Sequence, residues 1–336
     1  MKIDGGISFN LESAASSAKE AEEAGYTGAF TAETSHDPFL PMAVAAENTS
    51  TLELGTAIAV AFARTPMTVA NTAWDLQNFS NGRFILGLGS QIKPHITKRF
   101  SMEWSSPAAR MREFVQALHA IWDTWQTGDR LDFRGDFYQH TLMTPMFSPE
   151  PLTVPKPKVF IAAVGEMMTG VAGEVCDGWF SHGFTTASYL EEVSLPALNA
   201  GIDKAGRNTD DVEISLPGFV VTGETEEEMA AAALAVRKQI AFYGSTPAYR
   251  KVLDHHGWGE AQTELNHMSK QGQWDAMADV IDQEMLETFA VVAEPANVAT
   301  ELKDRYAHLV DRFSFYAPYG ANPDLWRGVI AELQDN

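Results

Sequence analysis

The alternation of apolar segments with helical segments constrains the fold of this chain more than any other feature. Eight segments have the apolar character of buried strands: residues 2–9, 28–32, 52–63, 83–88, 158–163, 178–181, 212–222 and 312–316. Buried strands separated by helices favour a parallel sheet that helices cover on both faces. Eight strand–helix units within 336 residues therefore predict an α/β protein, a closed (β/α)8 TIM barrel.

Two intervals between these strands are too long for a simple barrel. They predict insertions after the fourth and seventh strands, over about residues 90–157 and 223–311, within a single domain of residues 1–336. In the first insertion, apolar positions at helical spacing predict a helix over 107–128 with Ser106 as its cap, and a hairpin is expected to turn near Gly135. In the second, Thr225 is the expected cap of a helix with an acidic first turn.

Composition narrows the partners that this chain can have. Lysine and arginine number 24 and aspartate and glutamate 45, so the net charge of −21 argues against nucleic acid or an anionic membrane as the main partner. A single cysteine, Cys176, precludes an internal disulfide and is expected in the core. Without a targeting or membrane-spanning stretch, a cytoplasmic protein is expected. No metal is expected, because His255, His256 and His267 lack paired ligands at metal spacing.

Polar residues collect at the carboxyl ends of the predicted strands, where barrel enzymes place their active sites. Glu33, Ser35 and His36 follow the second strand, and His182 follows the sixth. His36 and His182 could exchange a proton near neutral pH, and each could instead be a structural histidine. The other strand-end candidates are Ser8, Asn10, Asp37, Arg64, Gly89, Ser90, Gln91, Ser181, Tyr316 and Tyr319.

Two segments could receive an anion. Gly165 joins a buried strand to a helix rich in small residues, and such a joint lets backbone amides and a helix N-terminus approach a phosphate. Plain packing explains such a joint as well. Residues 93–99 (KPHITKR) hold three fixed positive charges against the acidic background. They are either solvated surface charges or an electrostatic binding site for an anionic tail or phosphate.

Five ordered motifs carry a resemblance to a known family. They are the segment from GISFNLESAASSAKEAEEAGYTGAF to TAETSHDPF, then LELGTAIAVAFARTP, NGRFILGLGSQ, the RGDFYQH hairpin and AAVGEMMTGVAGEVCDGW. In this order they make the chain similar to the bacterial luciferase-like superfamily of flavin and deazaflavin barrels. Within it, the chain resembles the dehydrogenases that use coenzyme F-420. The resemblance extends over essentially the whole chain.

The resemblance implies roles for particular residues. It implies a cis peptide bond at Ala57–Ile58, behind the deazaflavin ring, and it places His36 near the reactive ring carbon. The other implied cofactor contacts are Ser35, Gly89, Ser90 and Gln91 beside the ring and its chain, the amides of Gly165, Glu166 and Met167 at the phosphate, and His182 on the substrate side. Where sugar-phosphate dehydrogenases of the family carry acidic residues, this chain has Asn10, Ser35 and the Gln91–Ile92 pair, which argues against a sugar phosphate.

These features together predict an oxidoreductase that uses coenzyme F-420. It would transfer a hydride between the deazaflavin C5 and a small carbonyl, alcohol or activated alkene, with His36 handling the proton and Glu33 as the second candidate. An FMN-dependent monooxygenase of the same fold and a non-catalytic flavin-binding protein are the alternatives. A small-molecule substrate and a homodimer are expected, the latter by analogy with the family.

Overall fold

The computed structural model describes residues 1–320 and 322–334. All eight predicted strands form, as β1 (Lys2–Gly6), β2 (Gly28–Thr31), β3 (Glu53–Thr56) continued by β4 (Ala59–Val60), β5 (Phe84–Gly89), β8 (Lys158–Ala162), β9 (Gly178–Phe180), β10 (Glu213–Val221) and β12 (Arg312–Tyr316). Three more strands are β6 (Phe133–Arg134), β7 (Gln139–His140) and β11 (Ala290–Val292).

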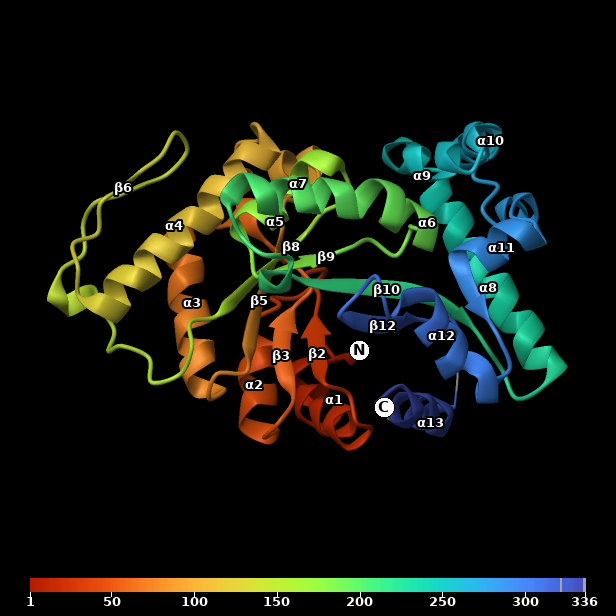
Figure 1. Cartoon of the computed structure of the whole chain (residues 1–336), viewed down its shortest axis with the longest axis horizontal. Coiled ribbons are helices and arrows are strands. Elements are labelled where there is room, and N and C mark those ends of the chain that lie inside the picture. The colour runs from red at the N-terminus through yellow and green to blue at the C-terminus, as the bar shows by residue number, and fades with distance from the viewer. Residues whose placement is uncertain (321, 335–336) are drawn as a thin grey trace. The chain divides into compact units, whose positions relative to one another are not determined.

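Helices separate these strands along the chain (Figure 1). The first seven are α1 (Leu11–Glu23), α2 (Leu40–Asn48), α3 (Pro66–Phe79), α4 (Pro107–Thr127), α5 (Glu166–Val175), α6 (Ala187–Tyr189) and α7 (Leu195–Ala205). The later ones are α8 (Glu226–Gly244), α9 (Arg250–His255), α10 (Gly259–Lys270), α11 (Gln283–Phe289), α12 (Val298–Tyr306) and α13 (Pro323–Gln334). This succession of parallel strands and helices is that of a (β/α)8 barrel.

Two compact units divide the chain. The N-terminal unit comprises Asp4–Phe180 and Ala197–Glu213, and its parallel strands follow the order β1-β2-β3-β5-β8-β9. The C-terminal unit comprises Met1–Ile3, Ser181–Pro196 and Ile214–Asn336, with β10 between β11 and β12. The single-domain organisation with two insertions stays a prediction.

Each unit has its own apolar core. In the N-terminal unit, the core cluster consists of Phe30 from β2, Ile85 from β5, Phe160 from β8 and Phe180 from β9, and Ile58 packs against them. In the C-terminal unit, α8 and α11 cover β10 and β11 with a larger cluster. Its fully buried members include Phe184, Phe219, Val236, Ile240, Leu286 and Phe289. These clusters hold the backbone at the strand ends where the candidate residues lie.

The predicted strand over residues 52–63 is wrong in one respect, because it is not continuous. β3 follows β2 only as far as Thr56, and β4 then pairs with β5. At the break, the Ala57 amide donates to the Thr31 carbonyl at 2.6 Å, and the Val60 amide donates to the Glu33 carboxylate at 2.7 Å. A side chain thus takes an amide that a regular ladder would use.

The helix and hairpin of the first insertion form as predicted, but Ser106 does not cap the helix through its side chain. Ser106 has a left-handed backbone (φ 37°), and Pro107 begins α4. The hairpin β6–β7 turns after Gly135 and extends beside α4 (Figure 1). The buried Glu113 on α4 fixes this turn, since its carboxylate accepts the amides of Asp136, Phe137 and Tyr138 at 2.8, 2.7 and 2.5 Å.

Two further predictions of local structure are confirmed. The Thr225 side chain caps α8 by accepting the Glu228 amide at 3.2 Å. Cys176 ends α5 and is fully buried, and burial raises the pKa of its thiol. Within residues 1–320 and 322–334, no helix is both long and apolar enough to cross a membrane.

Candidate functional site

A buried carboxylate organises the end of β2 in the N-terminal unit. Oε2 of Glu33, whose side chain is 6% exposed, accepts from Arg64 Nη1 at 2.6 Å and from the Val60 amide at 2.7 Å. Arg64 also reaches the more exposed Asp37 at 3.2 Å. Asp37 in turn accepts the amides of Phe39 and Leu40 at the start of α2. Glu33 thereby ties the loop after β2 to the turn after β4.

The peptide bond between Ala57 and Ile58 is cis, as the resemblance implied. The Glu33 amide donates to the Ile58 carbonyl at 3.1 Å, which joins this turn to the end of β2. The Ile58 side chain lies against Gly89, where an added Cβ would approach Ile58 Cδ1 to 2.6 Å. Four of the predicted residues, Glu33, Ala57, Ile58 and Gly89, therefore lie together.

His36 and Ser35 lie on the exposed loop between β2 and α2. The ring of His36 stacks on Phe9, with centroids 5.3 Å apart and 21° between the planes. Phe9 is itself 45% exposed. The loop thus presents an imidazole and an aromatic ring at the carboxyl end of β2, where a planar ligand could contact both.

The basic segment of residues 93–99 reaches this same loop. Gln91, just before it, adopts a left-handed backbone (φ 58°), and its side chain accepts the Ile92 amide at 3.0 Å. Within the segment only Ile96 is buried, so the cationic side chains face solvent. Arg99 donates to the Thr34 carbonyl, two residues before His36. The chain thereby brings its basic run beside a predicted proton-transfer residue, with Ser90 at the preceding strand end.

The joint between β8 and α5 has the geometry of an anion seat. Gly165 precedes the helix with an extended backbone (φ −99°), and no atom would lie within 4 Å of an added Cβ. First-turn amides have no acceptor within their own helix, so they can bind an anion. Glu166 and Met167 form the exposed first turn. No described contact joins this seat to His36.

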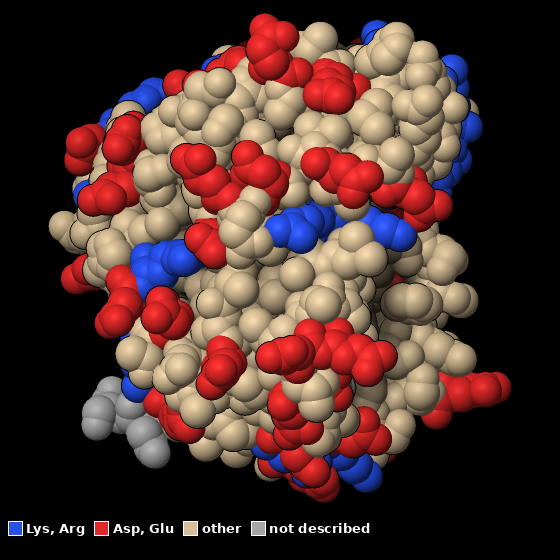
Figure 2. All heavy atoms as spheres, turned by 90° about the vertical axis from the view of Figure 1, so that its right-hand side faces the viewer, with Lys and Arg blue, Asp and Glu red and all other residues tan. Residues whose placement is uncertain are grey.

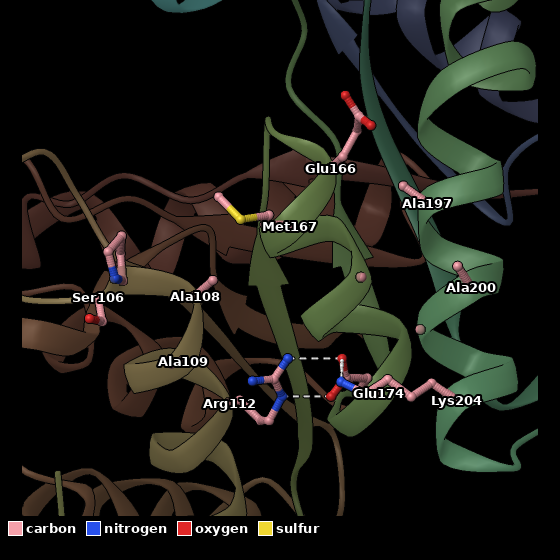
Figure 3. A pocket seen from close by; sticks show the side chains of 13 residues that line it. Ser106, Ala108, Ala109, Arg112, Glu166, Met167, Glu174, Ala197, Ala200 and Lys204 are labelled. Carbon is pink, nitrogen blue, oxygen red and sulfur yellow. Dashed lines mark hydrogen bonds and ion pairs between the residues drawn. The ribbon is translucent and has the colours of Figure 1, made fainter. Parts of the chain in front are cut away.

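A groove of about 700 Å³ continues from this seat between α4, α5 and α7 (Figure 3). Small residues line its walls, namely Ala108, Ala109, Gly170, Ala197, Ala200 and Gly201. Glu174 marks the other end, where it binds Arg112 at 2.5 Å and Lys204 at 2.8 Å. Burial would raise the pKa of Glu174, but these two cations lower it. Sequence reasoning missed this groove, because alanine and glycine carry no motif.

His182 lies in the C-terminal unit, within an aromatic cluster. Its Nδ1 accepts the Phe184 amide at 3.0 Å, and its Nε2 lies 3.1 Å from the Tyr249 hydroxyl. The ring stacks on Tyr249 with centroids 4.6 Å apart and meets Tyr243 edge-on at 4.8 Å. Burial lowers the pKa of His182 to about 4. The imidazole is therefore neutral at physiological pH.

Further tyrosines of the C-terminal unit have hydrogen-bonded hydroxyls, and sequence reasoning found only Tyr316 and Tyr319 among them. The hydroxyls of Tyr243 and Tyr316 lie 2.7 Å apart, and Tyr319 donates to the Val220 carbonyl at 2.9 Å. Burial raises the pKa values of Tyr249 and Tyr316, and that of Tyr319 to about 12. Tyr243 and Tyr249 come from the second insertion, where no local motif marks them. The roles predicted for all site residues stay predictions.

Comparison with known proteins identifies relatives over nearly the whole chain. A protein of Mycobacterium tuberculosis with no characterised function is 57% identical over 312 residues, or 93% of this chain and 92% of its own length. A putative coenzyme F-420-dependent oxidoreductase from the same organism is 25% identical and covers 84% of each chain.

Solved structures share the fold. The coenzyme F-420-dependent tetrahydromethanopterin reductase from Methanopyrus kandleri superposes with a TM-score of 0.78 over 99% of both chains, at 18% identity. This likeness confirms the predicted (β/α)8 barrel. The profile of the family described as luciferase-like monooxygenase matches residues 2–312. The chain therefore belongs to the luciferase-like monooxygenase family.

Proposed function

We propose that this protein is an oxidoreductase that binds the deazaflavin coenzyme F-420. When bound, this cofactor supplies a hydride, or accepts one, at its C5 carbon, and the other reactant is a small carbonyl, alcohol or activated alkene. The observation that carries the proposal is the contact of Arg99 with the Thr34 carbonyl, which holds the basic segment beside His36. The putative F-420-dependent relative from Mycobacterium tuberculosis supports the same cofactor.

The residues present fit such a cofactor. The anion seat at Gly165 is open, since an added Cβ there would meet nothing, and it suits a phosphate. The exposed cations Lys93, Lys98 and Arg99 suit a tail that carries several negative charges, because each would contribute attraction over about 10 Å. Within this proposal, His36 holds or accepts the proton that accompanies hydride transfer.

Glu33 has a different part in this proposal. Its Oε2 is occupied by Arg64 and the Val60 amide, so it fixes the turn at Ile58 rather than moving protons. His36 therefore remains as the leading candidate for the group that transfers the proton.

The homodimer stays an expectation, and a measurement of molecular mass by analytical ultracentrifugation would test it.

An FMN-dependent monooxygenase is the second candidate, because the family is described as luciferase-like monooxygenase and one solved structure of similar fold, a 3,6-diketocamphane monooxygenase, is a complex with FMN. FMN carries a phosphate but no further anionic tail, so it leaves the basic segment without a partner. A deazaflavin has carbon at position 5 and reacts poorly with oxygen. The two functions therefore predict opposite dependence on oxygen, and a non-catalytic flavin carrier predicts no turnover at all.

Cofactor titration of the purified protein tests the proposal. Fluorescence titration is expected to show tight binding of F-420 and weak binding of FMN. The substitution His36→Ala is expected to lower the turnover rate by about 100-fold or more, as loss of a general acid–base group does, while F-420 still binds. The exposed His267→Ala serves as control, with the rate unchanged. Tight binding of FMN without F-420, or full activity of His36→Ala, would overturn the proposal.

A further inference from the structure

The ring of His36 is oriented by stacking rather than by a hydrogen bond. Phe9 lies beside it, with the ring centroids 5.3 Å apart and 21° between the planes, a stacked geometry that aromatic pairs prefer. Among the residues that the structure describes, no hydrogen bond or ion pair reaches either ring nitrogen of His36. Histidines that transfer protons are usually oriented by a hydrogen bond to one of these nitrogens. Here the contact with Phe9 sets the direction of the ring instead.

The backbone of the loop that carries this histidine is fixed separately, by two arginines. Arg64 binds the Glu33 carboxylate through Nη1 at 2.6 Å and reaches Asp37 through Nη2 at 3.2 Å. Arg99 donates to the Thr34 carbonyl. The loop is therefore anchored on both sides of the histidine, and the rotation of the side chain is what remains to be set.

Phe9 is held in place by the residues on either side of it. The Ser8 amide donates to Ser17 Oγ at 3.0 Å, which ties the end of β1 to α1. The Asn10 side chain accepts an amide of the first turn of α1 at 3.1 Å and caps this helix. Phe9 is 45% exposed, so its replacement should affect the fold little, but it would remove the ring on which His36 stacks.

We propose that Phe9 is a positioning residue of this site, whose ring holds the imidazole of His36 in the orientation in which it exchanges a proton. The inference rests on the proposed function, in which His36 handles the proton that accompanies hydride transfer. No bond forms or breaks at Phe9, which acts only through His36. Both residues and all those that anchor them lie in the N-terminal unit, within Asp4–Phe180.

Nuclear magnetic resonance tests the stack without cofactor or turnover. In protein labelled with ¹³C-histidine, the ring current of Phe9 is expected to shift the carbon-bound ring protons of His36, and Phe9→Leu should return them toward the values of free histidine. The signals lost in His36→Gln assign them. Phe79→Leu, at a comparably exposed phenylalanine at the end of α3 in the same unit, is the matched control and should leave these signals unchanged. Identical His36 signals in wild type and Phe9→Leu would overturn the proposal.

Kinetics test whether the orientation matters for the rate. In the turnover assay used for His36→Ala, Phe9→Leu is expected to lower kcat by about 10- to 100-fold with the KM for F-420 unchanged, because small displacements of a reacting group have effects of this size. Phe9→Tyr keeps the ring and should retain most of the wild-type kcat, as should Phe79→Leu. Equal kcat in wild type and Phe9→Leu, or an equal loss in Phe9→Leu and Phe9→Tyr, would contradict the positioning role.

A double-mutant cycle tests whether Phe9 acts through His36. Residues that act as one unit give non-additive losses, so Phe9→Leu should lower kcat no further in the His36→Ala background. An equal loss in both backgrounds would refute the positioning role, since Phe9 would then affect the rate by another route.

The two measurements separate this inference from the function on which it rests. Wild-type protein that shows the Phe9-dependent His36 signals but does not bind F-420 would contradict the proposed function alone. Binding of F-420 by protein that lacks these signals would contradict the positioning role of Phe9 alone.

Discussion

Glu33 is the residue on which the turn after β2 depends most directly. Its charged oxygen accepts one guanidinium and one backbone amide, and its side chain is nearly inaccessible. Glu33→Gln keeps the size of the side chain and removes the charge. We expect the free energy of unfolding to fall by about 2 kcal/mol, since hydrogen bonds to a charged group contribute on that order. Urea denaturation measures this loss.

Asp37→Asn is the matched control for that experiment. Asp37 contacts the same Arg64, but at 3.2 Å and with a side chain 41% exposed. Exposed pairs contribute little, and asparagine can still accept the amides of Phe39 and Leu40, so a change below about 0.5 kcal/mol is expected. Equal losses in the two variants would show that charge at this turn, rather than burial, sets stability.

His182 gives the folded protein a characteristic dependence on pH. Burial lowers its pKa from 6.5 to about 4. Between these values the unfolded chain binds a proton that the folded chain does not, so the free energy of unfolding falls as the pH falls. The loss approaches about 3 kcal/mol at pH 4. In urea denaturation from pH 7 to pH 4.5, His182→Asn should lose correspondingly less stability than the wild type, and parallel curves would contradict the assignment.

At the scale of the elements, substitutions at two glycines are expected to separate an effect on the free energy of unfolding from an effect on cofactor binding. A Cβ on Gly87 in β5 would lie 1.7 Å from the Thr56 carbonyl oxygen, so Gly87→Ala must push β3 and β5 apart. We expect a loss of about 3 kcal/mol or more. At Gly165 an added Cβ meets nothing and the backbone suits any residue. Gly165→Ala should therefore change stability by less than about 0.5 kcal/mol.

The same variants give opposite results when a cofactor is added. A methyl group on Gly165 stands where a phosphate would meet the amides before α5, so calorimetric titration should show weaker F-420 binding by Gly165→Ala. Unchanged affinity would remove Gly165 from the cofactor site. Gly87→Ala protein that remains folded should bind normally, because Gly87 faces Thr56 and Phe180 within the core.

Sequence patterns predicted a helix or strand well where all the residues that make the pattern lie within that helix or strand. β5 and β8 are continuously apolar because they are buried, and α8 carries its own cap. The apolar pattern did not predict the break between β3 and β4, since the apolar sequence continues through it and Glu33, from another segment, accepts the Val60 amide there. Only the resemblance indicated an irregularity here, through the cis peptide bond that it implies at Ala57–Ile58. β11 was missed because its three residues lie in the second insertion, whose pattern indicates helices.

At the scale of the whole molecule, the net charge and the strand topology could be predicted from the sequence, but the aromatic cluster around His182 could not. Acidic side chains outnumber basic ones on the face shown in Figure 2, in line with the net charge of −21. His36 and Gly165 could be predicted because each directly follows a strand. Tyr243 and Tyr249 could not, because packing of α8 and the residues after it, rather than any strand end, brings them to His182.

The burial of Cys176 has a practical consequence for spectroscopy. The chain has no second thiol, and this one is fully enclosed and kept protonated. Maleimide dyes attack exposed thiolates, so the native protein should remain unlabelled while folded. A cysteine introduced at any accessible position would then carry the fluorophore or spin label alone, with no need to delete the natural residue first.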